Sequence, residues 1–201
     1  MHDGTISALL QKSIDARQSL FDSRHEAAFR LFNGFTEGYP HLSVDLYAGT
    51  VIFQNYNPDA SLGIAFVHVA KEILIDKLSW LRAGIVKSRN STSDEERRGK
   101  ILFGVAVDRK IKEHGVWYAI DLTINRDTSL YLDTRHLRKW LIENMNGKRV
   151  LNTFAYTGSF GVAALAGGAS RVVQLDHSRK FLNLAKESYA LNGFPLSLIH
   201  I

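Results

Sequence analysis

The hydrophobic residues in the first part of the chain follow two spacings. Apolar positions three or four residues apart are typical of one face of a helix, whereas short runs rich in Val, Ile, Leu, Phe and Tyr are typical of strands. This pattern predicts helices over residues 5–21, 26–31 and 64–81, and strands over residues 42–47, 51–56, 101–107 and 116–122. Ala48-Gly49 and Glu113-His114-Gly115 supply turns between strands. Residues 1–128 are therefore predicted to form an α+β module.

From residue 129 onward, helices and strands are predicted to alternate. Apolar spacing predicts helices over residues 135–145, 158–166 and 178–191, and strands over residues 149–154 and 171–175. Ser178 stands where a cap of the last helix is expected, and Asn192-Gly193 is a stop signal. Alternating strands and helices are typical of a parallel, doubly wound sheet. The predicted fold class is α/β, in which residues 129–201 form the first half of a Rossmann-like sheet.

One turn of this predicted sheet is a candidate binding site for a cofactor. The first strand runs into the turn Phe154–Gly158, from which a helix starts, and Asp176 follows at the end of the second strand. An α/β sheet holds a nucleoside-containing cofactor in this way, because the turn leaves room for the ligand and the carboxylate accepts bonds from ribose hydroxyls. Tyr156 replaces the first glycine of the dinucleotide fingerprint, which disfavours NAD. The alternative is that Asp176 is a solvated loop residue or a helix cap.

Five short sequence motifs, taken in their order and spacing along the chain, resemble those of one family. They are Tyr131-Leu132-Asp133-Thr134-Arg135, Leu151 to Gly158, Gly167-Gly168-Ala169, Leu175-Asp176-His177-Ser178 and Leu191-Asn192-Gly193. Residues 117–195 are thereby similar to the RlmI/RlmK-like class I S-adenosylmethionine (SAM) methyltransferases, which modify bases of large-subunit ribosomal RNA. The resemblance continues more loosely upstream, through Arg30–Gly34 and Val44–Tyr47.

The resemblance implies SAM as cofactor and a site at the carboxyl edge of the sheet. Asp176 would accept hydrogen bonds from both ribose hydroxyls of the cofactor. The methionine end would be wrapped, largely through backbone groups, by Phe154, Ala155, Tyr156, Thr157 and Gly158. The helix that begins at Gly158 has an N-terminal dipole that favours a carboxylate such as that of methionine. The alternative is that Thr157-Gly158 is only a tight strand-to-helix turn.

Three further residues are candidates by the same resemblance. Asp133 and Arg135 would lie over the cofactor or the substrate pocket, and His177 could lie along the adenine. Each role has a simpler structural alternative, since Asp133 or Thr134 could only cap the helix that follows, and His177 could only be an exposed surface residue.

The catalytic residue remains unknown from the sequence. In the cytosine-5 members of the family a cysteine after the fourth strand attacks the pyrimidine, and in the guanine-N2 relatives an Asn or Asp followed by Pro takes its place. This chain predicts two of the seven strands of such a sheet, so we expect a C-terminally truncated fragment that is inactive alone. Residues 196–201 match the translation of a sequencing-adapter end and are expected to be artefactual; the alternative is a genuine third strand.

Composition and charge restrict the function only mildly. The 201 residues are 45% hydrophobic and 22% charged, contain no cysteine and carry a net charge of +5, which suits a cytoplasmic protein with an RNA partner. No apolar run is long enough for a membrane helix, and no metal-ligand spacing is present. The basic stretch Lys87–Lys110 is either a solvated loop or a phosphate-contacting arm. The family resemblance also implies that the protein can form a homodimer.

The sequence thus predicts a SAM-dependent methyltransferase that acts on a base of ribosomal RNA. Two other functions stay open: a SAM methyltransferase for small molecules or proteins, and a non-catalytic RNA-binding protein with a residual Rossmann half. The α+β module and the basic stretch favour RNA, whereas the intact Gly158 and Asp176 argue against a decayed site.

Overall fold

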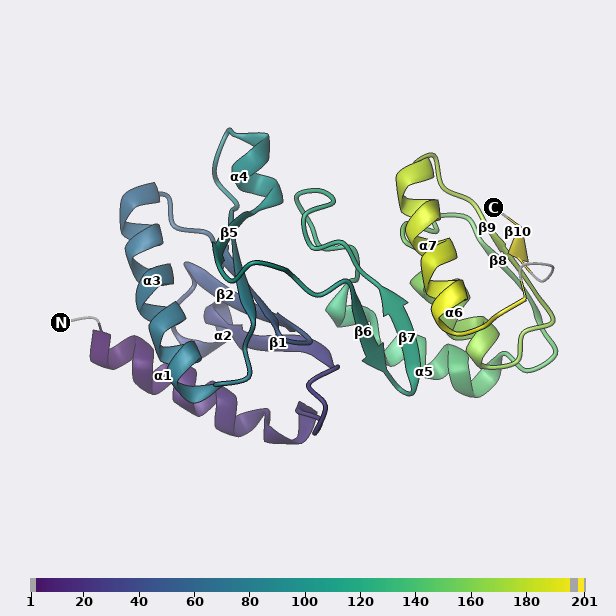
Figure 1. The fold of residues 1–201 in the computed structure, drawn as a ribbon, viewed down its shortest axis with the longest axis horizontal. Helices are drawn as coiled ribbons and strands as arrows, with labels where there is room; N and C mark the ends of the chain where they lie inside the picture. The colour runs from purple at the N-terminus through teal and green to yellow at the C-terminus, as the bar shows by residue number, and fades with distance from the viewer. Residues whose placement is uncertain (1–2, 196–198, 201) are drawn as a thin grey trace. The chain divides into compact units, whose positions relative to one another are not determined.

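The computed structural model describes residues 3–195 and 199–200, and the chain in it divides into two compact units (Figure 1). The first unit consists of Met1–Asp108 and Leu122–Asp127, and the second consists of Arg109–Asp121 and Thr128–Ile201. Among the described residues, no helix has both the length and the apolar character needed to cross a membrane.

The first unit is built on a five-stranded sheet in the order β1-β2-β3-β4-β5. The strands are β1 (Ala28–Asn33), β2 (Leu42–Tyr47), β3 (Thr50–Asn55), β4 (Ala83–Ser88) and β5 (Lys100–Phe103). Neighbouring strands are antiparallel except β3 and β4, which are parallel and are joined by a helix. The predicted hairpin is confirmed: Tyr47 pairs with Thr50 across the turn, where Ala48 has a positive φ of 52°.

Two long helices of the first unit, α1 (Asp3–Ala16) and α3 (Ala60–Lys77), pack together against this sheet. They bury apolar side chains that include Leu10, Val44, Phe53 and Leu74. Shorter helical segments are η1 (Gln18–Leu20), α2 (Gly34–Glu37) and α4 (Asp94–Arg98). The sequence therefore predicted the long helices correctly, because each of them carries a regular apolar stripe.

Three local predictions for the first unit were wrong. The segment predicted as a short helix over residues 26–31 is largely strand β1, because its backbone pairs with β2 and Arg30 forms an ion pair with Asp45. Strand β4, which the sequence did not indicate, runs into the first two residues of the basic stretch. The strand predicted over residues 101–107 is shorter, since β5 ends at Phe103.

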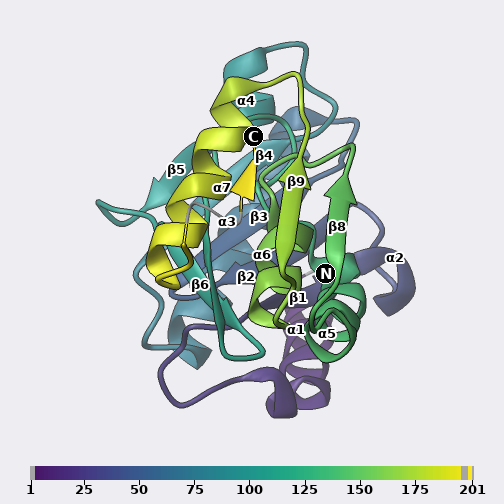
Figure 2. The ribbon, with the colours of Figure 1, turned by 90° about the vertical axis from the view of Figure 1, so that its right-hand side faces the viewer.

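The second unit contains a hairpin of β6 (Lys110–Glu113) and β7 (Val116–Ala119) and a parallel three-stranded sheet in the order β10-β9-β8. The sheet strands are β8 (Arg149–Asn152), β9 (Arg171–Gln174) and β10 (Ile199–His200). The helices are η2 (Leu132–Thr134), α5 (Arg135–Asn144), α6 (Ser159–Ala166) and α7 (Arg179–Leu191). Figure 2 shows β8 and β9 side by side, pointing the same way. The predicted α/β class with a Rossmann-like second part is confirmed.

The hairpin β6–β7 belongs to the second unit, whereas the sequence placed it in the module of residues 1–128. Its strand β7 is fixed to α7, because the Ala119 N–H donates to Ser188 Oγ at 2.9 Å and the Trp117 N–H donates to Asn192 Oδ1 at 2.9 Å. Contacts between residues about seventy positions apart leave no signal in local hydrophobic spacing, so this assignment could not be made from the sequence.

The hairpin is also tied to α5 by a buried ion pair. Arg138 Nε and Nη2 donate to the two carboxylate oxygens of Glu113 at 2.7 and 3.0 Å. Neither side chain is more than 1% exposed. Arg138 Nη1 donates to the Tyr131 carbonyl and to Thr134 Oγ1, so the guanidinium is satisfied on three sides.

The end of the chain is described only in part. Ile199 and His200 form β10, which pairs in parallel with Val172 and Val173 of β9. Residues 196–198 and 201, the rest of the segment expected to be artefactual, lie outside the described residues.

Candidate cofactor site

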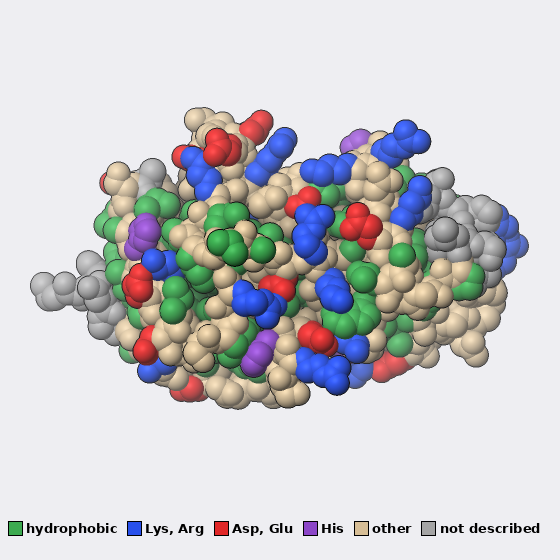
Figure 3. Space-filling model, in the orientation of Figure 1, with side chains coloured by type: hydrophobic (Ala, Val, Ile, Leu, Met, Phe, Trp, Pro, Cys, Tyr) green, Lys and Arg blue, Asp and Glu red, His purple; other side chains and the backbone are tan. Residues whose placement is uncertain are grey.

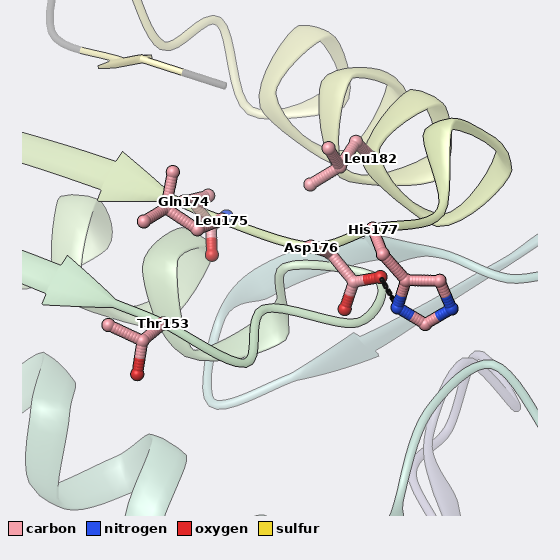
Figure 4. Close-up of a pocket in the computed structure, with 6 residues that line it drawn as sticks. All are labelled: Thr153, Gln174, Leu175, Asp176, His177 and Leu182. Carbon is pink, nitrogen blue, oxygen red and sulfur yellow. Dashed lines mark ion pairs between the residues drawn. The ribbon is translucent and has the colours of Figure 1, made fainter.

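A cavity of about 230 Å³ lies where β8 and β9 end (Figure 4). Two of the residues predicted to bind a cofactor, Asp176 and His177, line it. The remaining lining residues, which were not among the predicted cofactor-binding residues, are Thr153, Gln174, Leu175 and Leu182. In Figure 4 they come from the ends of both strands and from α7, so the cavity occupies the edge at which doubly wound sheets bind ligands.

The turn Phe154–Gly158 is held in a strained conformation beside this cavity. Tyr156 has a φ of 51°, in the left-handed region that costs an ordinary residue about 1–2 kcal/mol. Two hydrogen bonds hold it there: its N–H donates to Asp176 Oδ2 at 2.8 Å, and its hydroxyl donates to the Thr128 carbonyl at 2.8 Å. The Ala155 N–H donates to the Leu175 carbonyl at 2.9 Å, which fastens the turn to the end of β9.

Gly158 is required at the start of α6 for two reasons. Its φ is 75°, and a Cβ at this position would lie 2.5 Å from Ala185 Cβ and 2.5 Å from Gln174 Nε2. The helix therefore packs closely on β9 and α7, as a glycine in a cofactor-binding turn allows. Phe154 at the start of the turn is 83% exposed, so its ring is open to solvent.

Gln174 organises the interior behind the turn. It is fully buried, its Oε1 accepts a hydrogen bond from Asn152 Nδ2 at 2.9 Å, and its Nε2 donates to the Gly158 carbonyl at 3.2 Å. Nε2 also lies within hydrogen-bond distance of the Tyr189 hydroxyl. One side chain thus links β8, β9, the turn and α7. Gln174 is the last residue of β9, two residues before Asp176, and no motif in the sequence marks this role.

Asp176 combines features of both interpretations made from the sequence. Its side chain is only 4% exposed. Oδ2 accepts from the Tyr156 N–H, and Oδ1 accepts from the N–H of Ser178, the residue before α7, at 2.9 Å. Ser178 occupies the predicted cap position, but its own side chain makes no capping bond. A carboxylate has about four acceptor positions, so two bonds to backbone groups leave room for hydroxyl donors.

His177 points away from the protein. It is 88% exposed, and its Nδ1 lies 3.4 Å from Asp176 Oδ1 (Figure 4). This geometry is compatible with a ring at the rim of the cavity and equally with an exposed surface residue.

Asp133 and Arg135 do not line the cavity. Asp133 is exposed, and Arg135 Nε lies 4.0 Å from Glu113 Oε2, beside the buried ion pair. Thr134 precedes α5 as predicted, but its side chain makes no capping bond; its Oγ1 accepts from Arg138 Nη1 instead. The preceding residues reach the turn instead. The Ser129 carbonyl accepts a hydrogen bond from Thr157 Oγ1, and the Tyr131 ring lies 5.3 Å from that of Tyr156.

Most cations of the basic stretch Lys87–Lys110 are engaged within the first unit. Lys87 is fully buried, and its Nζ donates to the carbonyls of Asn125 and Asp127 at 3.0 Å each. Arg89 forms an ion pair with Asp127. Arg97 and Lys100 pair with acidic residues of α4, namely Asp94, Glu95 and Glu96. These contacts favour a structural role over a phosphate-contacting arm. The described residues also contain no group of acidic or histidine side chains arranged for a metal ion.

A turn into a helix, followed by an acid at the end of the adjacent parallel strand, lies at the sheet edge where Rossmann-like folds bind nucleoside cofactors. Comparison with protein families makes the class specific. Residues 95–201 match the model of the S-adenosylmethionine-dependent methyltransferases. These residues are more than half of the chain, which therefore belongs to this family. The cofactor of the family is SAM, as the sequence predicted.

Individual relatives agree with this assignment. Ribosomal RNA large subunit methyltransferase I of Aeromonas salmonicida (strain A449) is 31% identical over 189 residues, covering 94% of this chain and 48% of that protein. YwbD of Bacillus subtilis (strain 168), a candidate ribosomal RNA large subunit methyltransferase, is 34% identical over 197 residues, covering 91% and 46% respectively. The chain spans about half the length of the curated relatives it matches.

Solved structures give the same picture. A candidate SAM-dependent methyltransferase from Streptococcus mutans superimposes with a TM-score of 0.86 at 25% identity, covering 100% of this chain and 52% of its own. SMU.776, a candidate methyltransferase solved with SAH, also has a TM-score of 0.86 at 25% identity, covering 100% and 51%.

Proposed function

We propose that this chain belongs to a SAM-dependent methyltransferase that modifies a base of large-subunit ribosomal RNA. The single observation that carries the cofactor half of the proposal is the buried Asp176 carboxylate at the end of β9, beside a left-handed turn and a cavity. The RNA half is supported by the relatives, which are named for ribosomal RNA methylation. An rRNA substrate is consistent with a cytoplasmic location.

The residues around the cavity suggest how SAM would be held. The free acceptor positions of Asp176 would take the ribose hydroxyls, and His177 would lie at the adenine side of the rim. Backbone groups of the turn Phe154–Gly158 and the N-terminus of α6 would face the methionine carboxylate. Bound SAM would supply an electrophilic methyl group on its sulfonium. The protein's part is to orient that methyl group toward the base, which contributes through positioning.

Asp133 and Arg135 have a weaker place in this proposal. Both belong to the motif Tyr131–Arg135 shared with the family. Arg135, however, lies beside Glu113 and is not among the residues that line the cavity. We therefore propose that this motif supports the site indirectly, since its first residue, Tyr131, and Ser129 just before it contact the turn.

We expect methyl transfer to require more of the sheet than this chain supplies. The cavity of about 230 Å³ is smaller than the 300–1,000 Å³ typical of small-molecule sites. Strand β8 lies at the edge of the described sheet, and Leu151 on it is 63% exposed. Because the relatives are about twice as long, a longer chain would complete the site. The chain alone is expected to bind SAM weakly and to transfer no methyl group.

Titration of the 201-residue chain with SAM and with NAD, followed by ligand-observed NMR, tests the cofactor assignment. Asp176→Asn should weaken SAM binding by tenfold or more, because hydrogen bonds to a charged group are each worth about 1.5–3 kcal/mol. Glu187→Gln is the control, since it removes the same charge from an exposed position of α7, and it should leave SAM binding unchanged. Equal binding by the wild type and Asp176→Asn would refute the site, and preference for NAD would refute the cofactor.

The same proposal includes homodimer formation, which sedimentation velocity of the purified chain would test. A small-molecule or protein substrate is the second candidate, and it gains support only if the chain binds SAM but no RNA.

A further inference from the structure

The hairpin β6–β7 has one face turned into the second unit and one turned away from it. Ile111, Glu113 and Tyr118 are buried on the inner face. On the other face, Lys110 is exposed, and Lys112 and Trp117 are partly exposed. Lys112 pairs directly with Trp117 across the strands, and Lys110 lies two residues away on the same side. Figure 3 shows Lys and Arg side chains over this part of the surface.

The two lysines are held against an aromatic ring instead of an acid. The Nζ atoms of Lys110 and Lys112 lie 4.4 and 5.1 Å from the centre of the Trp117 ring. Within the part of the chain that the structure describes, neither ammonium forms an ion pair with a carboxylate. Lys100 and Arg97, by contrast, both pair with acids of α4. The outer face of the hairpin therefore keeps its positive charge available.

The backbone of the hairpin offers no competing mode of recognition at Trp117. The Asn192 side chain accepts from the Trp117 N–H at 2.9 Å and donates to the Trp117 carbonyl at 2.7 Å. Ser188 Oγ accepts from the Ala119 N–H. Because these groups occupy the free edge of β7, an extended partner cannot add there as another strand. The hairpin presents its side chains from a rigid support.

We propose that the outer face of β6–β7, formed by Lys110, Lys112 and Trp117, binds a single-stranded segment of the RNA substrate. The two ammonium groups would contact phosphates, and the indole ring would stack on a base, the combination that single-strand sites use. This assignment rests on the proposed function. The proposed phosphate contacts therefore lie on the hairpin β6–β7. This hairpin shares only Lys110 with the basic stretch Lys87–Lys110, for which the sequence suggested such contacts.

RNA binding by the complete 201-residue chain tests this surface. The probe is a fluorescein-labelled single-stranded oligonucleotide, and its anisotropy is measured over a range of salt concentrations. The double variant K110A/K112A should bind more weakly and should reduce the slope of log affinity against log salt by about 1.4, at about 0.7 for each lost phosphate contact. The double variant R97A/K100A removes the same charge from paired positions and should keep the wild-type slope.

Intrinsic fluorescence supplies an independent readout for the aromatic contact. RNA should quench the emission of the wild type, and W117L should abolish that quenching while Trp80 and Trp140 still emit. Circular dichroism checks that W117L remains folded, and W117F, which can still stack, should restore most of the affinity.

The outcomes separate this inference from the proposed function. RNA binding that both double variants lower equally would overturn the hairpin assignment and leave the methyltransferase proposal intact. Binding of SAM without any binding of RNA would overturn both the hairpin assignment and the RNA substrate. Equal, lysine-dependent binding to vesicles rich in phosphatidylserine would overturn RNA as the partner of this face.

Discussion

Replacement of Glu113 should destabilise the second unit more than any surface change, because its carboxylate is the partner of a fully buried guanidinium. Arg138 is 0% exposed and Glu113 is 1% exposed, with two hydrogen bonds of 2.7 and 3.0 Å between them. The change Glu113→Leu removes both bonds at once. It leaves Arg138 with its contacts to Tyr131 and Thr134 but with an uncompensated charge.

The expected loss is about 3–5 kcal/mol, the range for removing one partner of a buried ion pair. Solvent does not screen this interaction, since neither group reaches water. The pair as a whole is expected to contribute far less, because the cost of desolvating two ions offsets most of their attraction. The double variant Glu113→Leu with Arg138→Met should therefore regain most of the stability lost by the single variant.

Urea unfolding, followed by far-ultraviolet circular dichroism and by tryptophan emission, measures both effects. Trp117 and Trp140 report on the second unit, whereas Trp80 lies in the first. Lys139→Ala is a suitable control, because its i,i+4 pair with Glu143 is half-exposed and worth little. A loss below about 1 kcal/mol for Glu113→Leu, or a double variant no more stable than the single one, would show that the ion pair is not what holds the hairpin.

Three further changes test the packing behind the site and in the first unit. Gly158→Ala should cost about 2 kcal/mol or more in thermal unfolding, since the new Cβ would meet Ala185 and Gln174 at 2.5 Å and at positive φ. Burial raises the pKa of Tyr189 to about 12, above its value near 10 when unfolded, so stability should fall as pH rises from about 10 to 12, and less so in Tyr189→Phe. Lys87→Met should destabilise the first unit, because Lys87 Nζ donates to the backbone carbonyls of Asn125 and Asp127. It should leave the salt dependence of RNA binding unchanged, because a buried ammonium cannot contact phosphate.

The elements that the sequence predicted well are those with a local signal. Helix α3 has a long apolar stripe, and the turn after Glu113 is marked by Gly115, whose φ is 81°. Strand β1 has no such signal: its residues are equally compatible with a short helix, and pairing with β2 decides the matter. Tertiary pairing overrides weak local preference in such short segments.

In the candidate site, too, the residues with a local sequence signal were predicted, and those that depend on tertiary packing were not. Asp176 and His177 could be placed at the cavity because they follow directly after a predicted parallel strand. Gln174 and Leu182 could not, because their contacts depend on how α7 packs on the sheet. Arg138 is the extreme case, since a charged residue in an amphipathic helix is expected at the surface until its partner, twenty-five residues away, is known.

In the proposed site, cofactor binding and the order of the turn would depend on each other. The carboxylate that would accept the ribose hydroxyls also accepts the N–H of the left-handed Tyr156 and the N–H of Ser178, the residue before α7. A ligand on the free positions of Asp176 would fix the carboxylate, and through it the Tyr156 N–H and the first turn of the helix. Since a ligand that binds only the folded form stabilises it by mass action, SAM should raise the stability of the second unit against unfolding. The acid therefore positions the turn even without a cofactor, because it binds the N–H of Tyr156 in the left-handed conformation that glycine adopts without strain.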